Sequence, residues 1–409
     1  MISLKLGLRN IWKNRRRSFT TLLAVAIGFT AINLFAGYIH SVYTGIKKIA
    51  IHGEALGHLT VVKRGYYTEG KLHPEKYMLG KADLDKAMAL IRAEPGVRLV
   101  SPRLSLAGLV SNGRASTIFL AEGEIPEDSV KIRTGSVRTP PSMLNRDLPN
   151  AGLLSSDLAN LLGVKKGQTV VLMSSTLEGQ TNALDLEVQD TFNTGNAATN
   201  DKFALLPFAY AQSLVDTQGA SRVTVLLDPA HDDANAMRQR LLQKLNAAGL
   251  DVEIKTWLDL SLFYKQVKNM FDLIFLFLFT IVFIVVLMSI TNTMTTSVLE
   301  RTREIGTLRS LGMKRRKIME LFAVEGAMLG LFGCVLGLLL TWLGTVAVRA
   351  ANIRYIPPSS SDEVPLWVNF VPEMQLGSLL LLALVAMLAA LLPARRAART
   401  EIVDALGHV

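Results

Sequence analysis

The stretch SVLERTREIGTLRSLGMKRRKIMELF, residues 297–322, places ten charged side chains within residues 300–320. The sequence on either side, residues 273–299 and 326–348, contains no formal charge. A helix of about 20 apolar residues crosses a hydrocarbon core of about 30 Å. The pattern therefore predicts a short charged loop that joins two membrane-spanning helices.

Two further blocks without formal charge, residues 19–42 and 375–392, have the same character. The mean hydropathy of the whole chain is +0.31, which is high for a soluble protein. We therefore expect four spanning helices, with a buried core helix as the alternative for the shortest block, 375–392. The first block has the basic start of a secretory signal. It is longer than a typical apolar signal region and no small-x-small cleavage pattern follows it, which favours an uncleaved anchor.

The net charge of +10 is concentrated next to the apolar blocks. Basic residues gather before the first block, between the second and third, and after the fourth, whereas residues 46–266 are nearly neutral. In membrane proteins the excess of Lys and Arg lies in the cytoplasmic loops. The distribution predicts an inner (cytoplasmic) membrane protein with both termini and the loop at 297–317 in the cytoplasm. It also argues against a nucleic-acid partner.

Residues 46–268 are numerous enough to form a core of their own outside the membrane. The one cysteine, Cys334, lies in the third apolar block, so the outer segment can hold neither a disulfide nor a cysteine metal site. Strand and helix patterns alternate towards the two ends of this segment, while residues 123–195 are richer in turns and short strands. The expected fold is an α-helical membrane protein with four transmembrane helices and a large mixed α/β extracytoplasmic domain that carries a β-rich insert.

The expected segments follow one another along the chain. They are a cytoplasmic amphipathic helix (1–18), a first span (19–45), the outer domain (46–268) with its insert (123–195), a second span (269–296), the charged cytoplasmic loop (297–317), a third span (318–348), a short outer loop (349–374), a fourth span (375–392) and a cytoplasmic tail (393–409). The amphipathic helix is inferred from Leu4, Leu8, Ile11 and Trp12, which recur at helical spacing. A plain topology signal without a fixed helix is the alternative.

The charged loop has the composition of a short helical hairpin. Helix-forming residues continue through 300–311, and Gly312 suits the position just after a helix end. Three apolar residues at helical spacing give this helix an edge that fits a groove on a partner protein. Packing of the edge against its own subunit is the alternative. The residues expected to make the coupling contact are Arg301, Arg303, Glu304, Ile305, Leu308, Arg309, Leu311 and Gly312.

The third apolar block contains two features of its own. Gly326, Gly330, Gly333 and Gly337 form two small-xxx-small repeats, which permit close helix packing within one subunit or between two. Glu325 stands at the start of the block. It is either an intramembrane acid with a function or a residue at the level of the lipid headgroups.

Motifs of catalysis and metal binding are missing from the sequence. There is no HExxH pattern, and the six histidines show no ligand spacing. GYYTEGKL, residues 65–72, nearly matches a phosphate-binding loop, but a leucine replaces the hydroxyl that would bind magnesium. We therefore expect a non-catalytic chain that binds no metal or cofactor directly, with any nucleotide chemistry on another protein.

The charged loop and the glycines that follow it resemble the FtsX-like permease superfamily of ABC transporters. The resemblance is carried by ERTREIGTLRSLGMKRRKI (300–318) and EGAMLGLFGCVLG (325–337), and it extends to GLRNIWKNRRRSFTTLLAVAIG (7–28) and PARRAARTEIVDALG (393–407). By layout the chain is similar to the lipoprotein-releasing Lol type and to the macrolide-exporter type. It differs from the latter in having no fused ATPase domain before its first span.

The resemblance implies that the charged loop is the coupling helix for a pair of separate ABC ATPase subunits, which bind ATP and Mg. A second permease, either another copy or a paralogue, is implied as well. The expected function is extraction or export of lipoproteins or other amphiphiles, driven by ATP through movement of the periplasmic domain. An efflux permease and a signalling module that activates a cell-wall hydrolase are the alternatives.

Further partners follow from the same resemblance: membrane lipids and a periplasmic lipoprotein carrier or adaptor. Similarity to the Lol type implies that the acyl chains of a client lie near the first and second spans. Four aromatic residues there are candidates to line such a site, namely Phe29, Phe35, Phe275 and Phe279.

Overall fold

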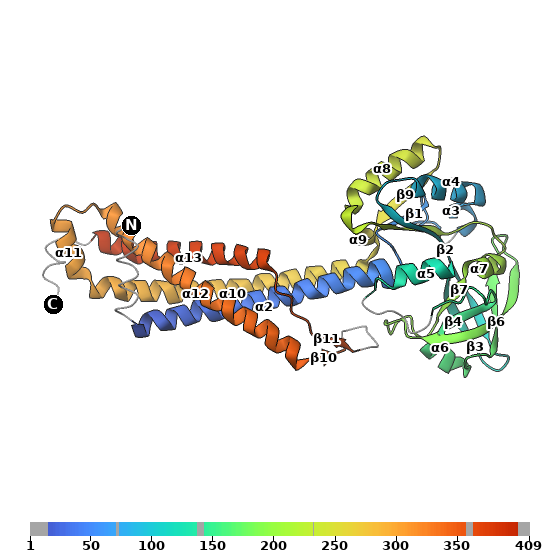
Figure 1. The fold of residues 1–409 in the computed structure, drawn as a ribbon, viewed down its shortest axis with the longest axis horizontal. Coiled ribbons are helices and arrows are strands. Elements are labelled where there is room, and N and C mark those ends of the chain that lie inside the picture. The colour runs from blue at the N-terminus through green and yellow to red at the C-terminus, as the bar shows by residue number, and fades with distance from the viewer. Residues whose placement is uncertain (1–14, 71–72, 137–142, 232, 357–362, 400–409) are drawn as a thin grey trace. The chain divides into compact units, whose positions relative to one another are not determined.

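The computed structural model describes residues 15–70, 73–136, 143–231, 233–356 and 363–399 (Figure 1). The chain divides into two compact units, which we describe separately. The helical unit comprises Met1–Val42, Val267–Arg354 and Pro365–Val409, and the sheet unit comprises Tyr43–Gln266 and Tyr355–Val364.

Among the described residues, four long helices and one short helix form the helical unit. They are α2 (Arg15–Lys48), α10 (Leu262–Glu300), α11 (Thr302–Ser310), α12 (Arg315–Ala351) and α13 (Pro372–Arg399). Each long helix contains a stretch that is long and apolar enough to cross a membrane. Large apolar side chains such as Leu273, Phe277 and Met288 are exposed along α10, a surface that hydrocarbon would cover. The length and composition of these helices suit a lipid environment.

The helices extend beyond the expected spans. α10 begins at Leu262, ahead of the expected start at residue 269, and residues 43–48 of α2 and 262–266 of α10 are part of the sheet unit. α13 continues through Pro393 to Arg399. Of the expected amphipathic helix only residues 15–18 are described, and they begin α2; its other residues and the tail from residue 400 lie outside the described part of the chain.

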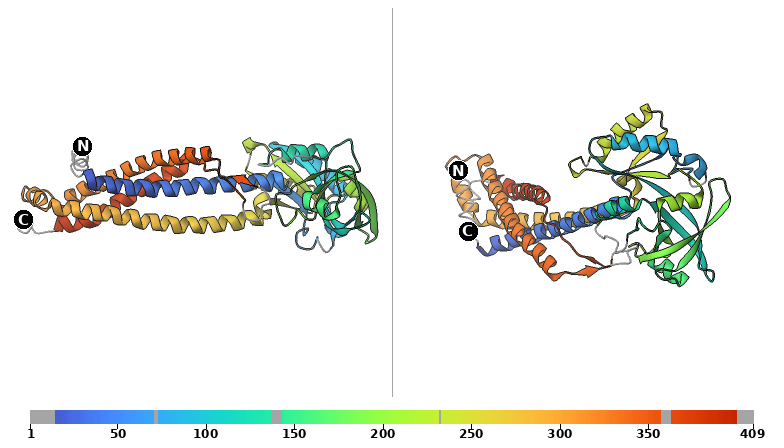
Figure 2. Two further views of the ribbon diagram at one scale, coloured as in Figure 1. Left: turned by 90° about the horizontal axis from the view of Figure 1, so that it is seen from below. Right: turned by 45° about the vertical axis from the view of Figure 1, so that its right-hand side comes forward.

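Two glycines bring α12 against α13 (Figure 2). A Cβ atom added at Gly326 would lie 2.4 Å from the Cβ of Ala390, and one added at Gly330 would lie 2.5 Å from the Cβ of Ala386. Both distances are far shorter than a van der Waals contact, so the two backbones can approach this closely only without side chains at the glycines.

The next two glycines of α12 face α2. A Cβ atom at Gly333 would lie 2.7 Å from Val25, and one at Gly337 would lie 2.8 Å from Phe29. All four glycines thus pack against helices of their own chain, which is the first of the two alternatives that the sequence left open.

Nine strands form one sheet in the sheet unit. They are β1 (Leu59–Lys63), β2 (Val97–Ser111), β3 (Ser116–Glu124), β4 (Ala151–Ser155), β5 (Thr169–Ser175), β6 (Thr181–Phe192), β7 (Phe203–Pro207), β8 (Arg222–Leu227) and β9 (Val252–Thr256), in the order β3-β7-β4-β6-β5-β2-β8-β1-β9. β2 also pairs with β3, so the pairings of β2, β3, β7, β4, β6 and β5 form a closed circuit. The remaining strands extend from β2, because the first part of β2 pairs with β8.

Helices and turns connect these strands. They are the π-helix η1 (Ile49–Gly53), α3 (Pro74–Tyr77), α4 (Lys81–Arg92), α5 (Pro126–Arg133), α6 (Ser156–Leu162), α7 (Phe208–Val215), η2 (Pro229–His231), α8 (Ala234–Ala247) and α9 (Trp257–Leu260). A separate short ladder joins β10 (Arg354–Tyr355) and β11 (Val364–Pro365).

The sheet unit has two main hydrophobic cores. One gathers apolar side chains of β1, β8 and β9 under α4 and α8, and the other lies among the strands of the closed circuit, α6 and α7. The second core takes in Met78 and residues from Leu104 to Val215, so it is wider than the β-rich insert expected at 123–195. The difference arises because β2, β3, β7 and α7 supply side chains from outside that range. β2 contributes to both cores, with Val100 in the first and Leu104 in the second.

Candidate functional site

The charged loop forms a separate short helix between two apolar ones. The expectation that the helix of the second span continues to residue 311 is wrong, since α10 ends at Glu300 and Arg301 has the non-helical angles φ −113° and ψ 14°. α11 then ends at Ser310 and is capped by Leu311. Gly312 follows with φ +93°, the left-handed conformation expected of a glycine just after a helix end. α12 starts two residues after Met313, at Arg315.

The expected apolar edge of α11 is divided between two surroundings. The side chain of Ile305 is 6% exposed and belongs to the core of the helical unit, together with Val298, Ile318 and Phe322. Leu311, in contrast, is 80% exposed, and Leu308 is half-buried. Ile305 therefore anchors α11 to its own chain, as in the self-packing alternative, while Leu311 at the end of this helix is exposed.

Charged residues at this end of the bundle connect four helices. We call Arg17, Glu300, Arg301, Glu304 and Glu325 the basal charge cluster. Arg17 of α2 pairs with Glu300 of α10 at 2.9 Å, and Arg301 pairs with Glu304 of α11 at 3.0 Å and with Glu325 of α12 at 3.2 Å. Arg301, which the sequence assigned to partner contact, therefore lies in contacts with its own chain.

Glu325 is buried among the helices. Its side chain is 6% exposed; it lies within hydrogen-bond distance of the Ser297 hydroxyl, 3.5 Å away, and the guanidinium of Arg301 lies over the ring of Phe322. A buried carboxylate is tolerated when it is paired in this way. Glu325 is thus a buried, paired acid, and its function and its level relative to the lipid headgroups stay predictions. Arg303, by comparison, is exposed on α11.

Aromatic rings line up between α2 and α10. The ring of Phe35 stacks on that of Phe275 with centroids 6.4 Å apart, and Phe275 stacks on Phe279 at 6.3 Å. Phe271 and Phe283 extend the row at its two ends. All these rings are half-buried, so they can contact a further apolar group.

Phe29 does not belong to this row. It is fully buried against Gly337 of α12, so it cannot line an accessible site in this arrangement, contrary to the expectation from the sequence. The row thus brings together three of the four aromatic candidates.

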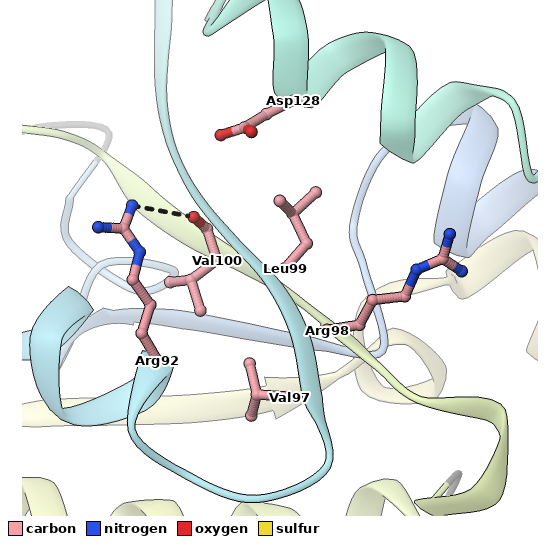
Figure 3. Close-up of a pocket in the computed structure, with 6 residues that line it drawn as sticks. All are labelled: Arg92, Val97, Arg98, Leu99, Val100 and Asp128. Carbon is pink, nitrogen blue, oxygen red and sulfur yellow. Dashed lines mark hydrogen bonds between the residues drawn. The ribbon is translucent and has the colours of Figure 1, made fainter.

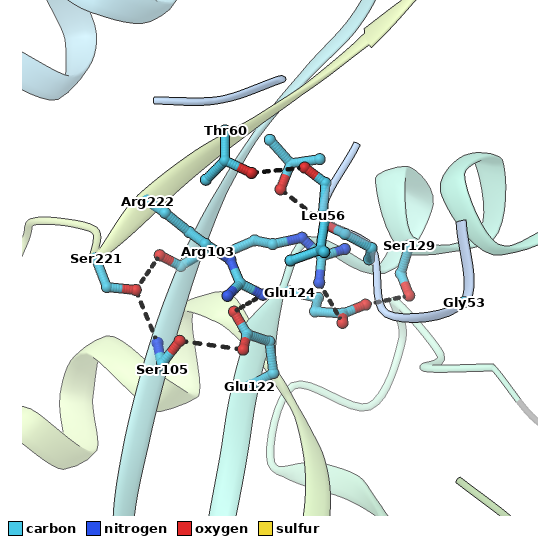
Figure 4. A network of polar contacts seen from close by, with 12 residues as sticks. Gly53, Leu56, Thr60, Arg103, Ser105, Glu122, Glu124, Ser129, Ser221 and Arg222 are labelled. Carbon is cyan, nitrogen blue, oxygen red and sulfur yellow. Dashed lines mark hydrogen bonds and ion pairs between the residues drawn. The ribbon is translucent and has the colours of Figure 1, made fainter. Parts of the chain in front are cut away.

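A buried ionic network joins β2, β3, α5 and η1 in the sheet unit (Figure 4). Glu124 accepts hydrogen bonds from Arg103, from the Ser129 hydroxyl at 2.5 Å and from Arg133, and Arg133 donates to the carbonyl of Gly53 at 2.6 Å. Burial alone would raise the pKa of Glu124, but the charges of Arg103 and Arg133 outweigh it and hold that pKa well below its usual range. No local pattern in the sequence indicates this network.

A second ion pair borders the first. Arg222 of β8 pairs with Glu122 of β3 at 3.1 Å, and the Ser105 hydroxyl donates to the same carboxylate at 3.1 Å. Arg103 on β2 therefore lies between two carboxylates of β3, and burial makes each of these charges dependent on its partners.

A small pocket lies beside the first part of β2 (Figure 3). It is lined by the backbone and side chains of residues 97–100, with Arg92 of α4 and Asp128 of α5, and Arg92 donates to the carbonyl of Val100 at 3.4 Å. Within the described residues no group of His, Cys, Asp and Glu could hold a metal ion.

Both units match models of known protein families. Residues 276–402 match the FtsX-like permease C-terminal model, and residues 18–243 match the MacB-like periplasmic core domain. The second match alone covers more than half of the chain, and the first includes all of α11, α12 and α13.

Curated relatives support these matches. The chain is 23% identical to the lipoprotein-releasing system transmembrane protein LolC of Neisseria meningitidis over 98% of each chain. It is 24% identical to LolE of Haemophilus influenzae, over 76% of this chain and 77% of LolE, and 34% identical to the macrolide export protein MacB of Bordetella avium, over 31% of this chain and 18% of MacB. The four apolar helices, the separate charged helix α11 and the two matched models all lead to one conclusion: the chain belongs to the FtsX-like permease family of ABC transporters.

Proposed function

We propose that the chain is a permease subunit that couples ATP hydrolysis by a separate pair of ABC ATPase subunits to the release or export of lipoproteins or other amphiphiles. The observation that carries the proposal is α11, a short helix joined to α10 and α12 at sharp breaks, with Ile305 on its own core and Leu311 exposed. A helix that is anchored on one side and exposed on the other is suited to receive a push from a cytoplasmic partner.

In this proposal ATP and Mg bind only to the ATPase subunits. Their closure displaces α11, and the movement passes through the basal charge cluster to the long helices. Because α2 and α10 each continue into residues of the sheet unit, they are the direct covalent route for that movement. A second permease, another copy or a paralogue, completes the complex in the inner membrane, with the termini and α11 in the cytoplasm.

The class of client follows from the surfaces of the long helices. Leu273–Leu299 offers no charge for a hydrophilic solute, whereas the aromatic row of Phe35, Phe275 and Phe279 offers an apolar, half-buried strip. An acyl chain exposed to water would cost about 0.8 kcal/mol for each methylene group, and contact with such a strip as the chain leaves the bilayer would avoid that cost. Membrane lipids compete for the same surface, and a periplasmic carrier protein would accept the released client.

Export with a periplasmic adaptor is the second candidate. It is favoured by the match of residues 18–243 to the MacB-like core domain. Mass spectrometry of the complex purified in native nanodiscs separates the candidates, because a co-purified lipoprotein supports release and a co-purified adaptor supports efflux. A complex that contains only a cell-wall hydrolase would contradict both.

Replacing Leu311 by Asp should weaken binding of the ATPase to the full chain by roughly 30-fold, the effect of losing about 2 kcal/mol at the centre of an interface. The physical reason is that Leu311 is the most exposed apolar residue of the loop and would bury against the ATPase. Leu308→Asp and Arg303→Glu should reduce ATP-driven release without preventing membrane insertion. Binding can be measured by biolayer interferometry on nanodiscs, with the ATPase that co-purifies with the chain.

Leu161→Asp is the matched control, since Leu161 is a similarly exposed leucine on α6 in the sheet unit. That variant should bind the ATPase normally. Unchanged binding and unchanged release in Leu311→Asp and Leu308→Asp would show that α11 is not the coupling helix.

A further inference from the structure

The position of Arg301 is unusual for a surface arginine. It is the single residue between the last residue of α10 and the first residue of α11, and its side chain is only 17% exposed. Its guanidinium contacts Glu304 of α11 through Nε and Glu325 of α12 through Nη1. The side chain of Arg301, at the break between α10 and α11, is therefore bound to both α11 and α12.

The two ion pairs of Arg301 differ in their surroundings. The side chain of Glu304 is 59% exposed, whereas that of Glu325 is 6% exposed and lies beside Phe322 and Ser297. Exposed ion pairs hold weakly because water and salt compete for the charges. A buried charge that loses its partner is much more costly. The link to α12 is thus the firm one, and the link to α11 is the one that can open.

A buried ion pair contributes little to net stability compared with apolar residues, but it fixes a geometry. Here it fixes the backbone at the break, because Arg301 belongs to the chain segment that bends. The neighbouring pair between Arg17 and Glu300 joins α2 to α10 at the preceding residue. The direction in which α11 leaves α10 is therefore set relative to α12.

We propose that Arg301 is the positioning residue of the coupling helix: its ion pair with Glu325 fixes the break between α10 and α11 against α12, while the exposed pair with Glu304 lets α11 rotate about that point. The role differs from direct contact with the ATPase. It rests on the proposed function in one respect, that α11 is the helix on which the ATPase acts.

The test measures the orientation of α11 in the full chain without any ATPase. Cys334→Ser removes the one native cysteine, and Ser310→Cys on α11 and Leu331→Cys on α12 place spin labels at exposed positions. Double electron–electron resonance in lipid nanodiscs then gives the distribution of distances between the labels. We expect a narrow distribution, and in Glu325→Gln the fraction of molecules outside its peak should rise by about tenfold. In Glu304→Gln the distribution should change little.

Two further variants separate positioning from a general loss of structure. Glu320→Gln removes an exposed ion pair with Lys317 on α12. This pair has the same three-residue spacing as the pair of Arg301 with Glu304. The variant should leave the distance distribution narrow. The exchange of Arg301→Glu with Glu325→Arg should restore the narrow peak. If Glu325→Gln does not fold, the exchange variant alone decides the question.

A narrow distribution in Glu325→Gln, or a broad one in the exchange variant, would overturn the proposal. Neither result depends on the ATPase, so failure of this inference is distinct from failure of the coupling function. In the assembled complex, Glu325→Gln should bind the ATPase as the native chain does yet lose ATP-driven release. A direct docking role for Arg301 predicts the reverse, with binding lost in Arg301→Ala and retained release in Glu325→Gln.

Discussion

Glu124→Gln will destabilise the strand and helix around it, β3 and α5, by about 3–5 kcal/mol, because it leaves two buried guanidinium groups without their carboxylate. Arg103 is 1% exposed and Arg133 is nearly as buried, so neither charge can be hydrated in place. A glutamine has almost the same shape, which excludes packing as the cause. Native-state hydrogen exchange of the β3 and α5 amides in the full chain measures the opening free energy.

The effect of Glu124→Gln depends on pH in a defined direction. Because the folded-state pKa of Glu124 is lowered from 4.5, its stabilising contribution is fully present above the unfolded pKa and disappears only as the pH falls through the lower folded value. The difference between native chain and variant should therefore persist from neutral pH to below pH 4.5. Asp251→Asn, which removes an exposed pair with Arg64, is the control and should leave exchange unchanged. Equal exchange in native chain and Glu124→Gln would show that the network is solvated.

Gly330→Leu should separate α12 from α13 and destabilise the helical unit by about 3 kcal/mol or more, which is the upper range for overpacking. The reason is steric, since even a Cβ atom at residue 330 would lie 2.5 Å from Ala386. Cys334 is buried one turn further along α12, so a thiol-reactive dye reports unfolding directly. We expect the dye to react at a clearly lower temperature in the variant.

Gly377→Leu is the matched control for this experiment. Gly377 lies on α13, and nothing lies within 4 Å of a Cβ atom built there. Its replacement should leave the transition temperature of the dye reaction unchanged. Equal temperatures for Gly330→Leu and the native chain would mean that α12 and α13 do not pack closely in the membrane.

Elements with a clear period were predictable from the sequence. Helix Phe208–Val215 and strand Arg222–Leu227 lie towards the end of the outer segment, where the sequence predicted alternating strands and helices. The hairpin of β2 and β3 turns at the Ser-Asn-Gly signal of residues 111–113. Local patterns decide these elements because turn residues and side-chain alternation are properties of a few consecutive positions.

The parts that the sequence did not reveal depend on contacts between distant segments. Glu122 and Glu124 stand in a strand that reads as half-exposed, and their partners on β8 and α5 become neighbours only once the strands pair. The inward turn of Ile305 follows in the same way from the break at Arg301, which no helix propensity signals. Arg301 and Glu325 lie 24 residues apart, beyond any local spacing rule.

The length of β2 has a consequence for how the sheet unit comes apart. This one strand supplies Val100 to the core beneath α4 and α8, and Leu104, Leu106 and Val110 to the core beneath α6 and α7. If either core unfolded, the part of β2 in that core would lose its fixed conformation. The strands of the other core would then lose part of the strand with which they form hydrogen bonds. The two halves should consequently melt as one cooperative body, with a single calorimetric transition and no half-folded species.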